Sequence, residues 1–236
     1  MYSLKLTRNG GVKMKNGRTL KPTKPLTWNN IPRQGVLVIT GHRGQGKSAL
    51  GWWLAQELQK KSRKQISALG MPIEARDNFP KRGFGKGGIN WVNSIEDIAQ
   101  LKPSIVVADE ASFIANSRRA MSKQNQEWLK LIAICRHKDH LLIFISQHSR
   151  QVDVQILMDA DLVLMKAPTE LHLRFARPEF APEMTEAFNL FENMRDSRKK
   201  VFVVDYHFGR KGMLSSRMPK WWTEKISKSF SSASVI

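Results

Sequence analysis

Short runs of apolar residues, separated by longer polar stretches, mark out the middle of the chain. Val36–Ile39, Ile105–Ala108, Leu141–Ile145 and Leu162–Met165 are continuous apolar runs of strand length. Such runs are typical of parallel strands that are buried on both faces of a sheet. Between the first two runs, apolar residues recur at helical spacing from Ala49 onward. This alternation predicts an α/β fold with a central, mainly parallel sheet.

The same periodicities predict the remaining elements. Helices are expected over residues 94–101, 116–135, 152–159, 184–193 and 219–230, and further strands over residues 65–69, 171–176 and 201–206. Ser94 and Asp97 have the spacing of a capping box at the start of the first of these helices. Residues 70–88 are rich in Gly, Pro and basic side chains and have no periodicity, which predicts a long loop. That loop is either a DNA-contacting loop or a disordered insertion, and the sequence favours neither.

We expect the chain to divide into three parts. Residues 1–35 contain RNGG and KNGR, both turn signals of a β-hairpin, and every charged side chain before Glu57 is basic. A small basic N-terminal hairpin could contact nucleic acid or a neighbouring subunit, or it could be an ordinary solvated surface. Residues 36–210 are predicted to form the core, and residues 211–236 a C-terminal helix and a loose tail.

The charge balance adds a candidate partner. The 236 residues carry 39 Lys and Arg against 20 Asp and Glu, a formal net charge of +19. This excess favours a polyanionic partner, above all nucleic acid; an anionic membrane surface and a merely soluble basic protein are the alternatives. The apolar runs are too short to cross a bilayer, the N-terminus lacks a signal-peptide core, and Cys135 is the only cysteine. We therefore expect a cytoplasmic protein without a transmembrane segment or an internal disulfide.

The run GHRGQGKS carries the main chemical signal. It fits G-x-x-x-x-G-K-[ST] at every fixed position and lies between a predicted strand and a predicted helix, the context of a phosphate-binding loop. Backbone N–H groups and the helix N-terminus would cradle phosphate oxygens, Lys47 would reach the β- and γ-phosphates, and Ser48 would hold Mg²⁺. A glycine-rich turn without a ligand is the weaker alternative. The residues assigned to nucleotide binding are Gly41, His42, Arg43, Gly44, Gln45, Gly46, Lys47, Ser48 and Ala49.

A second motif ends the apolar run 105–108. Asp109 and Glu110 come directly after it, so a parallel strand would carry both carboxylates to the edge of the sheet at which the phosphate-binding loop lies. Asp109 is the expected Mg²⁺ ligand, directly or through water, and Glu110 the expected group that polarises the attacking water. Alone the pattern is common, but after a complete phosphate-binding loop it favours nucleotide hydrolysis.

Taken together, GHRGQGKS, VVADEAS and ICRHKDHLLIFISQHSR followed by DADLVLM resemble the FtsK–HerA superfamily of P-loop ATPases in order and spacing. Within it the sequence is most similar to small genome-packaging ATPases of membrane-containing icosahedral viruses. The zonula occludens toxin-like assembly ATPases of filamentous phage share the same core. The resemblance covers about residues 36–165. It does not cover the N-terminal hairpin or the C-terminal region.

The resemblance implies an ASCE, RecA-like P-loop NTPase fold, a three-layer sandwich, with Glu110 as the catalytic glutamate and Gln147 as a polar sensor of the γ-phosphate. It also implies a homo-oligomeric ring, usually a hexamer, with ATP at the subunit interfaces. Arg136 holds the position of an arginine finger that acts on the neighbouring subunit, and Arg150 is the second candidate. Alternatively, Arg136 could merely cap the C-terminus of the preceding helix.

The implied function is ATP-driven DNA translocation, most plainly genome packaging by a virus. Double-stranded DNA, a virion portal and virion membrane proteins are the expected partners, in the host cytoplasm or at a packaging vertex. A filament-assembly ATPase is the nearest rival, although those proteins commonly carry a membrane span after the core. A nucleotide-binding switch with slow hydrolysis is a further alternative. A GTPase would need an Asn-Lys-x-Asp motif, which is absent, and a small-molecule kinase would not need a charge of +19.

Overall fold

The computed structural model divides the chain into two compact units, Met1–Ile31 and Pro32–Ile236. The described residues are 5–6, 12–13, 25–71, 73–85, 87–109, 121–146, 157, 159–176, 178 and 180–232. In the first unit, β1 (Lys5–Leu6) pairs antiparallel with β2 (Val12–Lys13), which confirms the predicted hairpin. The short 3₁₀ helix η1 (Trp28–Asn30) comes next in the same unit.

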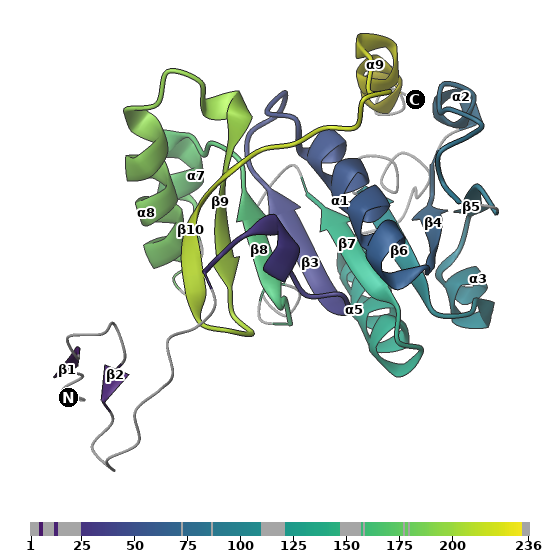
Figure 1. Ribbon diagram of the computed structural model, residues 1–236, viewed down its shortest axis with the longest axis horizontal. Helices are drawn as coiled ribbons and strands as arrows, with labels where there is room; N and C mark the ends of the chain where they lie inside the picture. Colours follow the sequence, from purple (N-terminus) through teal and green to yellow (C-terminus); the bar gives the residue numbers. More distant parts are fainter. Residues whose placement is uncertain are drawn as a thin grey trace. The chain divides into compact units, whose positions relative to one another are not determined.

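The second unit is built on an eight-stranded sheet in the order β10-β9-β8-β3-β7-β6-β4-β5 (Figure 1). Its strands are β3 (Gly35–Thr40), β4 (Gln65–Leu69), β5 (Ile89–Val92), β6 (Ser104–Asp109), β7 (Leu141–Ile145), β8 (Leu162–Met165), β9 (Lys200–Asp205) and β10 (Arg210–Ser215). From β8 to β5 all neighbouring strands are parallel, whereas β9 and β10 are antiparallel additions at one edge. The α/β class with a mainly parallel sheet is thereby confirmed.

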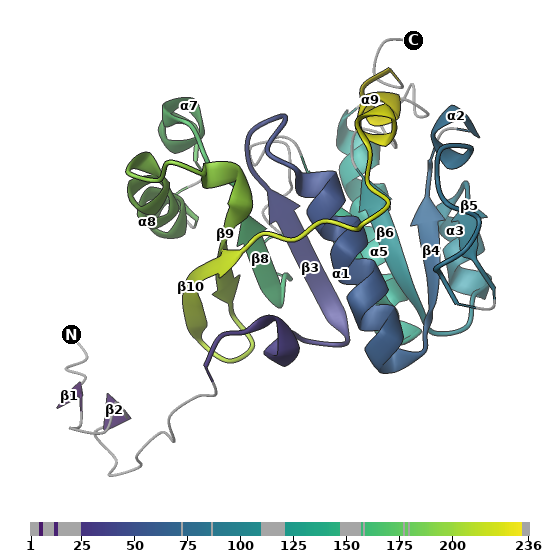
Figure 2. The ribbon, with the colours of Figure 1, turned by 45° about the horizontal axis from the view of Figure 1, so that its top comes forward.

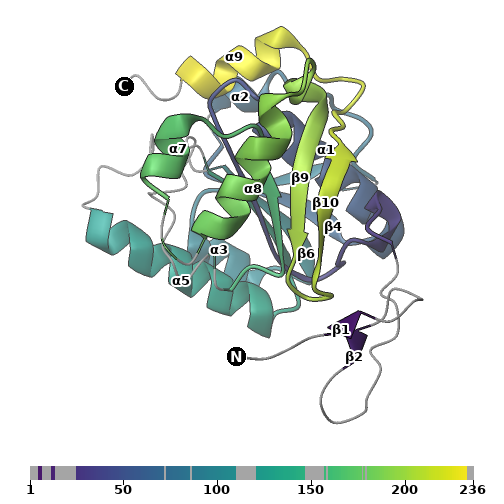
Figure 3. The ribbon, with the colours of Figure 1, turned by 90° about the vertical axis from the view of Figure 1, so that its left-hand side faces the viewer.

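Helices cover both faces of this sheet and make it the middle of three layers (Figures 2 and 3). α1 (Lys47–Ser62) packs on one face, chiefly against β6 and β7. On the other face, α3 (Ile95–Gln100), α5 (Met121–His137) and α8 (Ala181–Glu192) contribute to one apolar core. The other helices of the described residues are α2 (Ile73–Arg76), α7 (Glu170–Arg174), η2 (Ser197–Lys199) and α9 (Glu224–Ser232). The predicted capping box is confirmed, because Ser94 Oγ accepts the Asp97 N–H and Asp97 Oδ2 accepts the Ser94 N–H, each at 3.1 Å.

Strand parity assigns each core side chain to a face. Val36 and Val38 of β3 belong to the core shared with α5 and α8. Ile39 lies on the opposite face, where it and Ile145 approach Gly51 of α1 so closely that an added Cβ would lie 2.6 Å from the Ile145 Cδ1. The P-loop helix is therefore seated directly on the two central strands.

The predicted strand over residues 171–176 is wrong. The run LHLRFA alternates apolar and polar residues, yet residues 170–174 form α7, and Leu171 is 63 % exposed. Thr169 explains the difference, because its side chain and that of His172 form a capping box at the helix N-terminus. Leu173 and Ala176 pack against the apolar core from this capped segment, so the period of two does not mark a strand.

The C-terminal region also differs from the prediction. The terminal helix α9 begins at Glu224, so residues 219–223 of the expected helix are not helical. The sheet extends to Ser215 through β10, past the expected core boundary at residue 210. Both β10 and the edge strand β5 went unpredicted, because half-exposed edge strands lack the continuous apolar run of the central ones. The division of the chain at residue 35 stays a prediction.

An aromatic cluster holds the segment after Pro219, where a helix was expected. Trp221 packs 5.2 Å from Phe79 and 5.4 Å from Phe84 between ring centroids, and its Nε1–H donates to Gln56 Oε1 of α1 at 3.1 Å. Phe79 in turn lies 4.6 Å from the fully buried Trp52. The described part of the 70–88 loop is therefore packed onto α1 and contains α2, so the loop is not a disordered insertion there.

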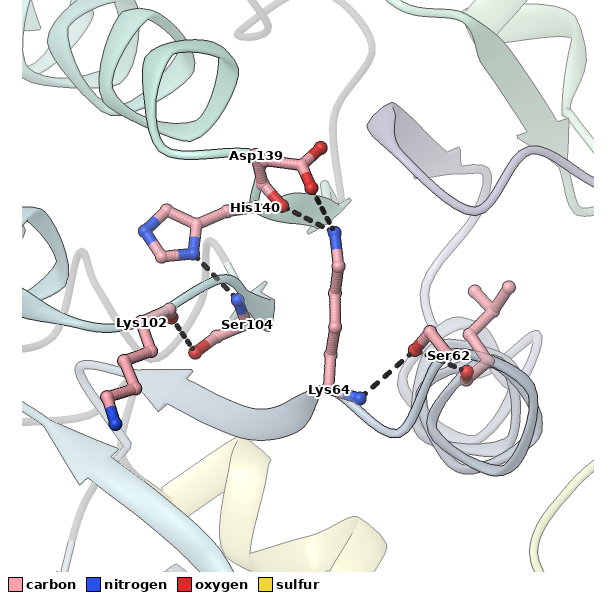
Figure 4. A network of polar contacts seen from close by, with 7 residues as sticks. Ser62, Lys64, Lys102, Ser104, Asp139 and His140 are labelled. Carbon is pink, nitrogen blue, oxygen red and sulfur yellow. Dashed lines mark hydrogen bonds and ion pairs between the residues drawn. The ribbon is translucent and has the colours of Figure 1, made fainter.

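A polar network holds the amino ends of the strands (Figure 4). His140, which is 1 % exposed, accepts the Ser104 N–H at its Nδ1 over 2.9 Å, at the first residue of β6. Burial is the main cause that lowers the pKa of His140. Beside it, the Lys64 ammonium donates to the main-chain oxygen and the carboxylate of Asp139. The His140 ring is consequently held in its neutral form as an acceptor.

Candidate functional site

The GHRGQGKS run forms a loop at the carboxyl end of β3, which passes directly into α1. Gly46 is the N-cap of α1 with φ 81°, a left-handed conformation that costs glycine little and other residues more. The loop closes on itself through the Gln45 N–H, which donates to the His42 carbonyl at 3.4 Å. It therefore has the strand–loop–helix geometry that the sequence predicted, with the positive end of the helix dipole at its mouth.

Lys47 lies folded over this loop. Its side chain is 6 % exposed, and its Nζ donates to the main-chain oxygens of Gly41 at 2.9 Å and His42 at 3.0 Å. The ammonium thus lies within the turn of backbone that is expected to surround phosphate. An incoming anion would meet a positive charge that is already in position.

Ser48 and Asp109 meet at the same edge of the sheet. The Ser48 hydroxyl donates to Asp109 Oδ2 at 2.7 Å, although 61 residues separate them in the chain. Asp109 is the last residue of β6 and is 2 % exposed. A hydroxyl and one carboxylate next to a phosphate-binding loop fit Mg²⁺, which is usually held by one or two carboxylates together with phosphate oxygens. The pair therefore has the ligand chemistry that was predicted for it.

The segment after β8 forms a side wall of the loop that sequence reasoning missed. The Lys166 N–H donates to the Thr40 carbonyl at 2.8 Å, and the His42 N–H donates to the Ala167 carbonyl at 3.5 Å. His42 also meets His172 of α7 edge to face, with ring centroids 6.0 Å apart. One signal was available, since a lysine directly after an apolar strand stands where a parallel sheet would bring it beside the loop.

Arg136 lies far from this site. It is at the end of α5, before β7, and so at the amino edge of the sheet, whereas the loop is at the carboxyl edge. Its guanidinium contacts Asp159, at 3.0 Å to the carboxylate and 3.1 Å to the main-chain oxygen. Arg136 can therefore act on phosphate only in another subunit. Glu110, Gln147 and Arg150 lie outside the described residues.

Comparisons with known proteins agree with this geometry. No family model and no curated protein matches the chain. Among solved structures, the genome packaging NTPase B204 from Sulfolobus turreted icosahedral virus 2, in complex with AMPPCP, matches with a TM-score of 0.58 at 13 % identity, over 80 % of this chain and 100 % of that chain. The DNA-packaging ATPase B204 from Sulfolobus Turreted Icosahedral Virus matches with a TM-score of 0.58 at 15 % identity, over 79 % and 98 %.

The chain has the P-loop NTPase fold. The expected likeness to viral packaging ATPases is confirmed for the fold. At 13 % and 15 % identity, the likeness shows the fold alone. Among the described residues, no helix is both long and apolar enough to span a bilayer.

Proposed function

We propose that this protein is an ATP-hydrolysing, Mg²⁺-dependent DNA translocase that packages a viral genome. The observation that carries the proposal is the contact between Ser48 and Asp109 beside the complete phosphate-binding loop, GHRGQGKS, which is a Walker A motif. That contact joins the two motifs of a P-loop NTPase at one edge of the sheet, where a nucleotide would lie. The packaging role is supported by the likeness to two solved viral packaging enzymes and by the net charge of +19.

Each site residue has one proposed task. Lys47 exchanges its main-chain acceptors for the β- and γ-phosphates, which requires only a rotation of its flexible side chain. Ser48 and Asp109 hold Mg²⁺, which would neutralise charge that develops on the phosphates. Glu110 accepts a proton from the attacking water or orients it, and Gln147 senses the γ-phosphate; both roles rest on the sequence alone.

The assembly proposed for this function is a homo-oligomeric ring, a hexamer in the simplest case. Because Arg136 lies at the other edge of its own sheet, a role as arginine finger requires a neighbouring subunit to bring its nucleotide there. In this proposal the ring moves double-stranded DNA in the host cytoplasm or at a packaging vertex, with portal or membrane proteins of the virion as partners. Membership of the FtsK–HerA superfamily is part of the same proposal.

The test is ATP turnover with and without double-stranded DNA, with the Lys47→Ala variant as the blank. We expect Mg²⁺-dependent turnover that rises on addition of DNA and is absent from the variant. Turnover that ignores DNA would favour a nucleotide-binding enzyme or switch with another partner, and equal turnover in the variant would refute the site itself.

A further inference from the structure

Lys166 is a buried lysine that the chemistry described so far does not use. It comes directly after β8, and it is 0 % exposed. A lysine is almost never fully buried unless its ammonium is satisfied. Its Nζ donates to two main-chain oxygens, of Arg198 at 2.5 Å and of Lys200 at 2.8 Å, where η2 passes into β9. These contacts satisfy the ammonium without neutralising its charge.

The side chain of Lys166 lies on the same face of the sheet as the P-loop helix. Val163 and Met165 of β8 belong to the core shared with α5 and α8, so alternation along the strand directs residues 164 and 166 to the other face, which α1 covers. β8 is also the strand that pairs with β3, the strand leading into the loop. Lys166 is therefore beside the loop both along the sheet and across it.

The backbone of the loop rests directly on Lys166. The Lys166 N–H donates to the carbonyl of Thr40, and the next residue, Gly41, has a φ of +134°. A Cβ added at Gly41 would lie 2.6 Å from the Lys166 main-chain oxygen and 2.8 Å from its Cβ. The first glycine of the Walker A motif is therefore required by this close approach, and any displacement of Lys166 must move the loop.

Lys166 and Lys47 bring two positive charges to this edge of the sheet. Among the described residues, no carboxylate forms an ion pair with Lys166. Burial, and after it the charge of Lys47, lowers the pKa of Lys166 to about 8. Within the described part of the chain, the charged and polar groups that act on its ammonium are Lys47 from α1 and the two main-chain oxygens from η2 and β9. Two like charges held together at a buried site are a mutual cost that a bound polyanion would relieve.

We propose that Lys166 is a second cation of the nucleotide site, which supports the first Walker A glycine and adds a buried positive charge that strengthens binding of the triphosphate. The proposal rests on the proposed function, because it needs a nucleotide in the loop. By linkage, the nucleotide must then favour the protonated form of Lys166 by the same factor by which that charge strengthens nucleotide binding. Nucleotide binding near pH 8 is therefore coupled to uptake of a proton.

The magnitude of the uptake is set by this reciprocity. If the nucleotide raises the pKa of Lys166 by one unit, the charged form binds it about tenfold more tightly than the neutral form, and about 0.4 proton is taken up per site at pH 8. Bound Mg²⁺ favours the fully ionised terminal group of the analogue, and the titration of Lys166→Met subtracts any proton that this group still exchanges. The advantage of wild type over a neutral side chain should fall from about tenfold at pH 7 to under about twofold at pH 9.5.

The experiment is calorimetric titration of the full chain with Mg²⁺ and AMPPCP, a non-hydrolysable analogue, in two buffers of different ionisation enthalpy. We expect proton uptake at pH 8 in wild type, no uptake from this source in Lys166→Met, and weaker binding by that variant at pH 7. Lys166→Arg keeps the charge at every pH, so it should bind well at pH 9.5 without uptake. Lys138→Met, which removes an exposed lysine at the opposite edge of the sheet, is the matched control.

The outcomes separate the two proposals. If wild type binds the analogue without proton uptake at pH 8, or if Lys166→Met takes up as much as wild type, the role of Lys166 is refuted and the nucleotide site stands. If wild type does not bind the analogue at all, the proposed function fails instead. Should Lys166→Met not fold, the wild-type measurement across pH 7 to 9.5 still decides, because it needs no variant.

Discussion

Protonation of His140 should destabilise the fold, and the size of the effect can be bounded. Burial lowers the pKa of His140 below the usual value of 6.5, and its Nδ1 must stay unprotonated to accept the Ser104 N–H. Above about pH 7.5 the ring is neutral in both states, so it adds no pH dependence. As the pH falls through the unfolded-state pKa of 6.5, the unfolded chain binds the proton first, so stability decreases until the folded-state pKa is reached.

The loss from this one group is at most about 1.4 kcal/mol per pH unit, because the unfolded state gains at most one proton more than the folded state. The assay is urea unfolding between pH 5 and 8 on wild type and on His140→Asn, whose amide oxygen can replace Nδ1 as the acceptor but does not titrate. Subtracting the two curves cancels the other titrating groups. We expect the stability difference between wild type and variant to be flat above about pH 7.5 and wild type to lose stability relative to the variant as the pH falls below that value; a difference that is constant from pH 5 to 8 would refute the reasoning.

The aromatic cluster, the basic surface and the subunit boundary each lead to a prediction. Trp221→Ala should lower the free energy of unfolding by about 2–4 kcal/mol, because it removes several aromatic contacts and the bond to Gln56, whereas Trp221→Phe should lose less; equal losses on urea unfolding would contradict the packing role. DNA affinity should fall at least about a thousandfold between 50 and 200 mM salt if six or more phosphates are contacted. An affinity that does not change with salt would mean that the basic residues form an ordinary solvated surface and do not bind DNA. Mixing Arg136→Ala with Glu110→Gln subunits, each inactive alone, should restore partial ATP turnover; if subunits exchange and Arg150→Ala restores turnover where Arg136→Ala does not, the finger is Arg150.

The central part of the fold could be predicted because each of its strands is buried on both faces. A strand such as β7, with no exposed residue, has to be an unbroken apolar run, and the Walker A motif determines the loop and the helix after β3. The contact between Ser48 and Asp109 could be predicted for the same reason, since parallel strands bring their carboxyl ends to one edge.

The remainder depends on contacts between distant residues, which periodicity does not encode. Residues 171–176 alternate like a strand, but the cap at Thr169 makes them helical. The helix expected from Pro219 begins only at Glu224, and Trp221 lies before it in a cluster with Phe79 and Phe84. Lys166 appeared in the sequence only as the residue after an apolar run, and its place under Gly41 required the pairing of β8 with β3.

The measurement that tests the central claim most directly is the Mg²⁺ dependence of ATP turnover in wild type and in Asp109→Asn. The contact of Asp109 with the Ser48 hydroxyl assigns these two groups to one metal site. We predict that Asp109→Asn still binds nucleotide in the presence of EDTA, but needs much more Mg²⁺ and turns over at least about a hundredfold more slowly, as is usual when a charge-stabilising group of the reaction is lost. A variant that hydrolyses ATP at the wild-type rate, with the wild-type Mg²⁺ requirement, would contradict the account.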